Sequence, residues 1–297
     1  MKRILITGAN GMLGHRLVLE LSSSFEVHAT LRRNTGLEGL GRGPLLGAIL
    51  HPGVDLQSEI EIEELVKRAN PDAVVNAAGM IKQKVSEQSG DSMTKLNGLL
   101  PKTFGRLAKS GGFRFISIST DCVFSGAKGQ YAESDVPDCT DEYGLSKLAG
   151  ENCGEDSLVL RTSIVGRELS GAYGLLEWFL SMRGNVVKGF ENAFFSGLST
   201  NELARVVHRI LDSQESLSGL HNVAGNRISK ADFLELANEL FESNTLIERV
   251  TEPSIDRSLD ASRFNRATNY TPPSWREMLS EISQLSDTYE RWRIQKF

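Results

Sequence analysis

The first half of the chain alternates short apolar runs with longer stretches in which apolar residues recur every three or four positions. The short runs predict strands at Arg3–Thr7, Val27–Leu31, Ala73–Ala77, Phe113–Ser119 and Leu158–Arg161. The longer stretches predict helices at Gly11–Leu21, Ile60–Ala69, Met93–Lys109 and Glu142–Asn152. Strands and helices that alternate in this way form βαβ units, so we expect an α/β fold with a doubly wound parallel sheet covered by helices on both faces.

The second half shows a weaker alternation. We expect helices at Tyr173–Met182, Thr200–Leu211, Ser229–Phe241 and Pro273–Leu285, and strands at Val186–Gly189 and Leu220–Ala224. Residues 33–53 are rich in glycine and predict a long loop after the second strand. These elements predict two domains: residues 1–165 with about 196–225 form the sheet domain, and about 166–195 with 226–297 form a smaller C-terminal α/β lobe.

Composition narrows the class of protein. The 297 residues are 40% hydrophobic and 24% charged, which is typical of globular proteins and excludes a disordered chain. The formal net charge of -5 gives no global positive field, so we expect neither nucleic acid nor a membrane surface as a partner. Three cysteines without a C-x-x-C pair indicate neither a disulfide framework nor a zinc site and favour a reducing, cytoplasmic setting. No apolar run approaches the roughly 20 residues that cross a bilayer.

A glycine-rich segment follows the first predicted strand and opens the first predicted helix. It reads Gly8-Ala9-Asn10-Gly11-Met12-Leu13-Gly14. Gly8 permits a tight turn, Gly11 lets a phosphate approach the backbone, and Gly14 lets the helix pack closely on the strand. A strand, such a turn and a helix form the place where a dinucleotide pyrophosphate meets backbone N–H groups, so the segment predicts a Rossmann nucleotide-binding domain.

The ends of two further strands bear on the cofactor. The second strand ends at Arg32 and Arg33 with no carboxylate before Glu38, which favours NADPH over NADH; the competing interpretation is two solvated loop arginines. The strand that ends in Asn76-Ala77-Ala78-Gly79 has small residues that let a cofactor, or a packed helix, lie close to the backbone. Lys82 follows as a cation near the site or as a solvated loop lysine.

Two segments carry the candidate chemistry. Ser119-Thr120-Asp121 places polar side chains at the end of a strand, and Tyr143 and Lys147 lie four residues apart on one face of a helix. A tyrosine ordinarily titrates near pH 10, so a nearby ammonium is needed to favour phenolate at neutral pH. Y-x-x-x-K alone is a weak pattern that more often marks an exposed helical pair. With the glycine loop and the strand end in this order, it favours an enzyme that exchanges a proton with its substrate.

Together these segments resemble the extended short-chain dehydrogenase/reductases, and within them the dTDP-4-dehydrorhamnose reductase type. The resemblance spans nearly the whole chain and rests on the glycine loop and on Asn76–Gly79, Ser119–Gly126, Tyr143–Glu151 and Leu160–Ser163. It implies a Rossmann domain that binds NAD(P)H, a C-terminal lobe that binds a nucleotide-diphosphate sugar, and reduction of a C4 ketone on a 6-deoxyhexose.

The resemblance also implies roles for single residues. Tyr143 would donate a proton to the keto oxygen, Thr120 would hydrogen-bond the same oxygen, and Lys147 would orient the cofactor ribose and lower the pKa of the tyrosine. The expected cofactor contacts are Gly8, Asn10, Gly11, Met12, Leu13, Gly14, Arg32, Arg33, Asp55, Leu56, Ala77, Ala78, Gly79, Tyr143 and Lys147. The expected substrate contacts are Lys82, Thr120, Asp121, Trp178 and Arg257.

The identity of the substrate stays open at this point. Cys122 stands where the rhamnose enzymes usually carry tyrosine, and Trp178 on a helix is more often a core residue than a ligand contact. The substrate diphosphate needs cations, and the candidates are Lys82, Lys188, Lys230, Arg257 and Arg263. No acidic residues match those that bind magnesium at some dimer interfaces of the family, so we predict no metal.

Two alternatives to a reductase remain. One is a sugar-nucleotide epimerase or dehydratase, in which the cofactor stays bound and is regenerated. The other is a non-catalytic NADP-binding regulatory subunit, as in the β subunit of methionine adenosyltransferase, which resembles the same family. A homodimer is an arrangement that such folds commonly adopt.

Overall fold

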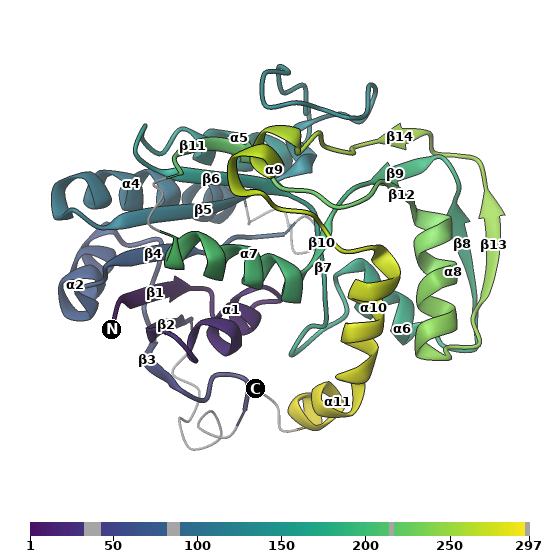
Figure 1. The fold of residues 1–297 in the computed structure, drawn as a ribbon, viewed down its shortest axis with the longest axis horizontal. Coiled ribbons are helices and arrows are strands. Elements are labelled where there is room, and N and C mark those ends of the chain that lie inside the picture. Colours follow the sequence, from purple (N-terminus) through teal and green to yellow (C-terminus); the bar gives the residue numbers. More distant parts are fainter. Residues whose placement is uncertain (33–42, 82–89, 214–216, 295–297) are drawn as a thin grey trace.

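The protein is built around a parallel sheet (Figure 1). The computed structural model describes residues 1–32, 43–81, 90–213 and 217–294. Within them the largest sheet has seven strands in the order β11-β6-β5-β4-β1-β2-β3, and all its pairings are parallel. Its strands are β1 (Arg3–Thr7), β2 (Glu26–Leu31), β3 (Ala48–Pro52), β4 (Ala73–Asn76), β5 (Arg114–Thr120), β6 (Leu158–Thr162) and β11 (Gly219–Asn222). The predicted α/β class with a doubly wound sheet is confirmed.

Successive residues of each strand face opposite helix layers. In β1, Ile4 and Ile6 belong to one apolar core and Leu5 to the other. The first core is shared with α1 (Gly14–Leu21) and α7 (Thr200–Asp212), which pack on each other. The second is shared with α2 (Glu59–Ala69) and α4 (Leu100–Gly111). Because both faces are covered, the strands carry apolar residues toward both helix layers, which is why the sequence predicts most of them.

Residues 48–52 form a strand, so the prediction of a loop over all of 33–53 is wrong there. β3 pairs with β2 at the edge of the sheet. An edge strand needs only one partner, and Ile49 keeps 49% of its surface exposed, so the segment lacks the apolar run of a central strand. Its backbone pairing with β2 makes this segment a strand.

The helix predicted over Met93–Lys109 is interrupted. α3 (Gly90–Met93) leads into a π-helix at Thr94–Leu99, and α4 follows with a proline in its first turn, where the missing N–H is tolerated. π-helical turns widen the backbone and are frequent at functional sites. Asn97 lies within the π-helix and is 1% exposed.

The C-terminal lobe is built from small sheets and helices. β8 (Val186–Phe190) pairs with β13 (Leu246–Val250), and the remaining short strands are β7 (Ile164–Val165), β9 (Ala193–Phe195), β10 (Leu198–Ser199), β12 (Ile228–Ser229) and β14 (Ile255–Asp256). Besides α7, the helices that follow β6 are α6 (Leu175–Ser181), α8 (Lys230–Phe241), α9 (Ser262–Thr268), α10 (Trp275–Gln284) and α11 (Ser286–Ile294). Helix α5 (Glu142–Glu151) instead packs against β5 of the large sheet. The sequence had predicted none of β13, α9 and α11. The predicted domain boundaries stay a prediction.

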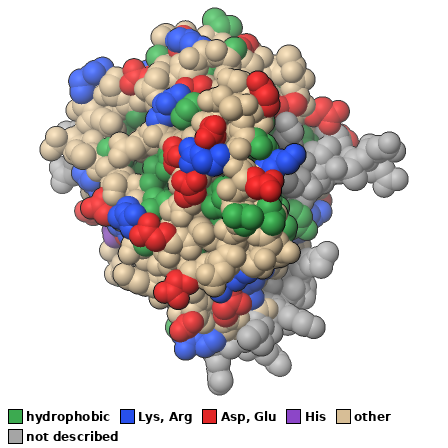
Figure 2. Space-filling model, turned by 90° about the vertical axis from the view of Figure 1, so that its right-hand side faces the viewer, with side chains coloured by type: hydrophobic (Ala, Val, Ile, Leu, Met, Phe, Trp, Pro, Cys, Tyr) green, Lys and Arg blue, Asp and Glu red, His purple; other side chains and the backbone are tan. Residues whose placement is uncertain are grey.

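Charges of both signs are mixed on the face that carries α8, β8 and β13 (Figure 2). Arg249 on β13, for example, pairs with Glu191, Asp232 and Glu235. Mixed pairs of this kind cancel locally, so this face carries no large field of one sign.

Candidate active site

The glycine loop lies where the strand order of the sheet reverses. β1 has β4 on one side and β2 on the other, and ligands of such sheets bind outside the carboxyl ends of the strands at this point. Gly8 follows β1 with φ +70, a left-handed conformation that favours glycine. A Cβ at Gly14 would lie 2.0 Å from the carbonyl oxygen of Gly8, so only glycine lets α1 approach the strand this closely.

The loop presents backbone donors without acceptors. Leu13, the N-cap residue of α1, gives no side-chain cap, and within the described part of the chain the amides of Met12, Leu13 and Gly14 have no hydrogen-bond acceptor. Such amides, with the positive end of the helix dipole, form an anion site. Asn10 is exposed beside them.

The end of β4 packs against this loop. The Thr7 hydroxyl donates to Asn76 Oδ1 at 2.6 Å and accepts from the amide of Ala78 at 3.4 Å. A Cβ at Gly8 would lie 2.8 Å from the Cα atom of Ala78. The structure therefore brings Ala77, Ala78 and Gly79 together with the glycine loop.

Asn97 fixes the segment that follows β4, and sequence reasoning missed it. Its side chain exchanges two hydrogen bonds with the backbone of Met80, at 2.9 and 3.1 Å, and donates to the Ser146 hydroxyl on α5 at 3.0 Å. A Cβ at Gly79 would lie 2.8 Å from Asn97 Oδ1 and 4.0 Å from Lys147 Nζ. The only signal in the sequence is an asparagine inside an otherwise amphipathic helical pattern.

The candidate catalytic residues converge at the end of β5. Thr120 is the last residue of β5 and caps a short 3-10 helix, Asp121–Val123, by accepting from the amide of Cys122. Asp141 caps α5, which places Tyr143 in the first turn and Lys147 one turn later. The Tyr143 hydroxyl lies close enough to the Thr120 hydroxyl for Thr120 to act on the pKa of the phenol, and Lys147 Nζ donates to the carbonyl of Ile118 at 2.6 Å.

Burial dominates the electrostatics of Tyr143 and Lys147. Burial, together with the acidic groups of Cys122 and Asp121, raises the pKa of Tyr143 above its usual value, so the phenol is protonated at neutral pH. The predicted lowering of the tyrosine pKa by Lys147 stays a prediction. Burial lowers the pKa of Lys147 to about 8. Tyr143 therefore carries a proton that it can donate.

Charged side chains from three elements meet beside the phenol. Asp121 is buried, which raises its pKa, while the guanidinium of Arg257 acts in the opposite direction. Arg257 Nε donates to the carbonyl of Phe124 at 2.9 Å. Lys230 opens α8, and its pKa is lowered by burial and by Arg257, with Asp121 opposing. Of the candidate cations, Lys230 and Arg257 therefore act on Asp121, whereas Lys188 is exposed on β8 and Arg263 donates to the carbonyl of Leu220.

Behind the catalytic face, α5 is tied to the sheet by three buried residues that we call the α5 anchor: Ser119, Glu151 and Arg161. The Ser119 hydroxyl donates to Glu151 Oε1 at 2.7 Å. Arg161 donates to both oxygens of Glu151, at 2.8 and 2.6 Å, and lies over the ring of Phe124. Sequence reasoning missed the anchor, although Glu151 repeats the spacing of four from Tyr143 to Lys147.

The remaining predicted contacts are dispersed. Arg32 is exposed after β2, Asp55 is exposed and accepts from the amide of Gln57, and Leu56 packs partly against the α2 side of the sheet. Trp178 lies on α6 with 37% of its surface exposed. Arg33 and Lys82 lie outside the described residues.

Neither a membrane span nor a metal cluster is found in the described ranges. No helix there is long and apolar enough to cross a bilayer. No group of three or more His, Cys, Asp or Glu side chains could hold a metal ion there either.

A family model accounts for this arrangement of loop, strand end and helix. The model of the RmlD substrate binding domain matches residues 1–287. The chain belongs to this family. It is thereby an oxidoreductase of the extended short-chain dehydrogenase/reductase group, similar to dTDP-4-dehydrorhamnose reductases.

Three relatives are distant in sequence and cover most of the chain. The chain is 30% identical over 304 aligned residues to the probable low-salt glycan biosynthesis reductase Agl14 of Haloferax volcanii, covering 96% of this chain and 98% of that protein. It is 26% identical to methionine adenosyltransferase 2 subunit beta of Danio rerio, covering 85% of this chain and 79% of that protein. A dTDP-4-dehydrorhamnose reductase of Bacillus anthracis, solved in complex with NADP, shares the fold with a TM-score of 0.75 at 20% identity, over 95% of this chain and 98% of that chain.

Proposed function

We propose that the protein is an NADPH-dependent reductase of a nucleotide-diphosphate 4-keto-6-deoxy sugar, acting in the synthesis of deoxysugar or polysaccharide precursors. The observation that carries the proposal is that the Thr120 and Tyr143 side chains lie close together at the end of β5, which is next to β4 and two strands from β1 and the glycine loop. Carbonyl reduction needs a proton donor beside a dinucleotide cradle, and this is such a pair.

The residues present fit a nicotinamide dinucleotide. The amides of Met12, Leu13 and Gly14 suit the pyrophosphate, and Lys147 keeps two N–H donors for ribose hydroxyls after its bond to Ile118. When bound, the dihydronicotinamide supplies the hydride. The NADP complex of the Bacillus anthracis neighbour supports this cofactor, and the exposed Arg32 after β2 favours NADPH.

The chain's own residues supply the proton and hold the carbonyl. Tyr143 gives its proton to the oxygen that becomes a hydroxyl, and Thr120 hydrogen-bonds the same oxygen. The raised pKa of Tyr143 keeps the proton on the phenol until charge develops on that oxygen. General acid help of this kind is typically worth about 10²- to 10⁴-fold in rate.

The charged residues beside the phenol suit a nucleotide-diphosphate sugar. Lys230 and Arg257 provide positive charge for phosphate oxygens, and Asp121 provides an acceptor for sugar hydroxyls. The name of the Haloferax volcanii relative, a glycan biosynthesis reductase, agrees with such a substrate.

The test follows NADPH absorbance with freshly prepared dTDP-, GDP- and UDP-4-keto-6-deoxy sugars, including 2-acetamido forms. We expect one member of the panel to be reduced. Tyr143→Phe should lose about 10²- to 10⁴-fold in kcat while its Kd for NADPH stays unchanged. A Tyr143→Phe variant that keeps most of its activity would show that the phenol is not the proton donor.

A second candidate is a regulatory subunit that binds NADP without turning over a sugar. The 26% identity to methionine adenosyltransferase 2 subunit beta favours it, and the complete Thr120, Tyr143 and Lys147 set argues against it. NADPH binding without oxidation by any sugar of the panel would support this candidate. Tightly retained oxidised cofactor without net NADPH consumption would instead point to an epimerase or dehydratase.

A further inference from the structure

The glycine loop opens a helix that carries a buried histidine which the proposed chemistry does not use. His15 Nδ1 lies 2.8 Å from the carbonyl oxygen of Gly11, and Nε2 lies 2.6 Å from the hydroxyl of Tyr289. A carbonyl oxygen only accepts, so we assign the ring proton to Nδ1, which leaves Nε2 to accept from the Tyr289 hydroxyl. Burial lowers the pKa of His15 to about 3, so the ring stays neutral and keeps this tautomer at physiological pH.

The hydroxyl that completes this chain of hydrogen bonds comes from the other end of the sequence. Tyr289 lies on α11, 274 residues from His15, and is 1% exposed. Its ring meets Trp292 edge-on and lies against the guanidinium of Arg167. Burial raises the pKa of its hydroxyl, and the positive charge of Arg16, which lies near that hydroxyl, acts to lower it.

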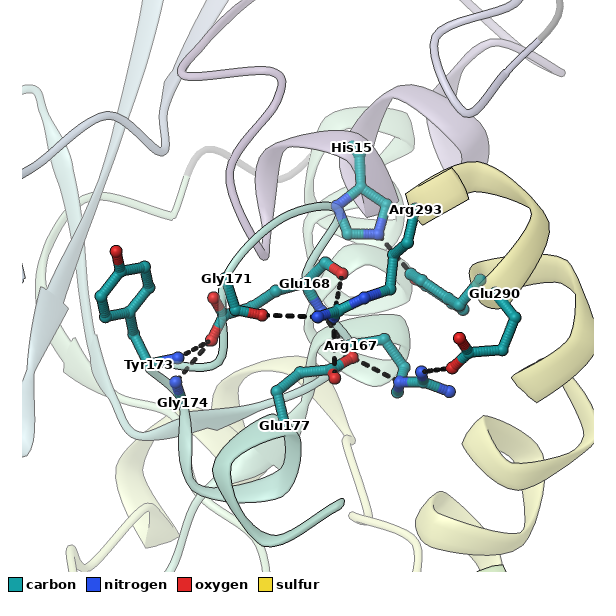
Figure 3. Close-up of polar contacts among 10 residues, drawn as sticks. His15, Arg167, Glu168, Gly171, Tyr173, Gly174, Glu177, Glu290 and Arg293 are labelled. Carbon is teal, nitrogen blue, oxygen red and sulfur yellow. Dashed lines mark hydrogen bonds and ion pairs between the residues drawn. The ribbon is translucent and has the colours of Figure 1, made fainter. Parts of the chain in front are cut away.

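Ion pairs hold α11 in place around Tyr289. We call Arg167, Glu177, Glu290 and Arg293 the α11 clasp (Figure 3). Arg167 pairs with Glu177 and, at 2.9 Å, with Glu290. Arg293 pairs with the second oxygen of Glu177 at 2.8 Å. Arg167 and Glu177 are almost fully buried, and their pairs with Glu290 and Arg293 join α11 to them.

The clasp also reaches the segment that leads into α6 (Figure 3). Arg293 donates to the carbonyls of Glu168 and Gly171, at 3.0 and 2.7 Å. The Glu168 carboxylate accepts from the amides of Tyr173 and Gly174. A Cβ at Gly174 would lie 3.3 Å from the sulfur of Met12, so this segment touches the glycine loop itself.

We propose that Tyr289 is a positioning residue for the pyrophosphate of the dinucleotide, acting through His15 on the Gly11 peptide. The peptide bond between Gly11 and Met12 is planar and trans, so its carbonyl and its N–H point in opposite directions. By holding the carbonyl toward α1, His15 turns the amide of Met12 the other way and keeps it available to an anion. The inference rests on the dinucleotide site proposed above. It adds that α11, at the end of the chain, helps to position a backbone amide of that site.

The test is the Kd of the full-length Tyr289→Phe variant for NADPH, measured by titration calorimetry. The change removes one oxygen and keeps the ring in place. It leaves His15 Nε2 without a donor, and we expect the Kd to rise about tenfold. At saturating NADPH, kcat should change by less than about twofold, because only binding is affected.

A matched control is Tyr270→Phe. Tyr270 is also buried, and its hydroxyl donates to Glu202 on α7 at 2.9 Å rather than to a residue of α1 or the glycine loop. The Tyr270→Phe variant should leave the Kd for NADPH unchanged. In a His15→Asn background the further change Tyr289→Phe should raise the Kd by less than about twofold, since the route through His15 is already broken.

The outcomes separate this inference from the proposed function. A wild-type Kd in Tyr289→Phe, or an equal rise in Tyr270→Phe, overturns the positioning role while leaving the dinucleotide site intact. Wild-type protein that binds neither NADPH nor NADH overturns the dinucleotide site itself.

Discussion

Two buried ion-pair clusters support the two halves of the candidate site, and they are built differently. The α5 anchor supports the catalytic helix and joins neighbouring elements, with Ser119 and Glu151 only 32 residues apart. The α11 clasp supports the glycine-loop side and joins Arg167 to Glu290, 123 residues away. Each contains an arginine side chain that is 3% exposed. The catalytic residues are thus held by their own motif, whereas the cofactor side depends on the end of the chain.

Removing the carboxylate of the α5 anchor should have the largest effect on stability. Glu151→Gln leaves Arg161 buried without a counter-charge, and we expect the free energy of unfolding to fall by about 3–5 kcal/mol. Because α5 carries Tyr143 and Lys147, kcat should fall as well. Denaturant unfolding and steady-state kinetics measure the two effects. Glu142→Gln, an exposed change on the same helix, is the control and should lower neither the free energy of unfolding nor kcat.

The corresponding change in the α11 clasp should separate stability from chemistry. Glu177→Gln removes the carboxylate that Arg167 and Arg293 share, and we expect a loss of about 3 kcal/mol in the free energy of unfolding. Because the clasp lies on the glycine-loop side, the KM for NADPH should rise while kcat stays near that of the wild type. A fall in kcat with an unchanged KM would contradict the division between the two clusters.

Lys147 gives the catalytic side a pH dependence of stability. Its pKa is about 8 in the folded protein against an ordinary 10.5, so the unfolded chain binds more protons between these values. The free energy of unfolding should therefore rise with pH from about 8 to 10.5, by up to about 3 kcal/mol. Lys147→Met should lack this rise. If the free energy of unfolding changed with pH by the same amount in the wild type and in Lys147→Met, the lowered pKa would be contradicted.

The smallest effect is expected at the rim of the α11 clasp. Glu290 keeps 64% of its side chain exposed although it pairs with the same Arg167 as Glu177 does. Solvent screening makes such a pair worth about 0.5 kcal/mol, so Glu290→Gln should barely change the denaturation midpoint. A loss as large as that of Glu177→Gln would show that the clasp depends on its exposed member.

The sequence predicted local features because they depend only on residues that are close together along the chain. The central strands are apolar on both faces, the glycine spacing fits a turn between strand and helix, and Tyr143 and Lys147 share a helix face at any position in a fold. These patterns predicted the doubly wound sheet, and they predicted which strand ends carry the candidate site.

Only the tertiary structure decided the rest. β3 is a strand because β2 lies beside it, and Lys230 and Arg257 reach Asp121 because α8 and the segment after β14 fold over the end of β5. The pKa of Tyr143 rises chiefly because the phenol is buried, which spacing along a helix does not reveal. Tyr289 meets His15 across 274 residues. Hydrophobic periodicity and short motifs report neighbours along the chain, whereas burial and long-range hydrogen bonds arise only when distant segments pack together.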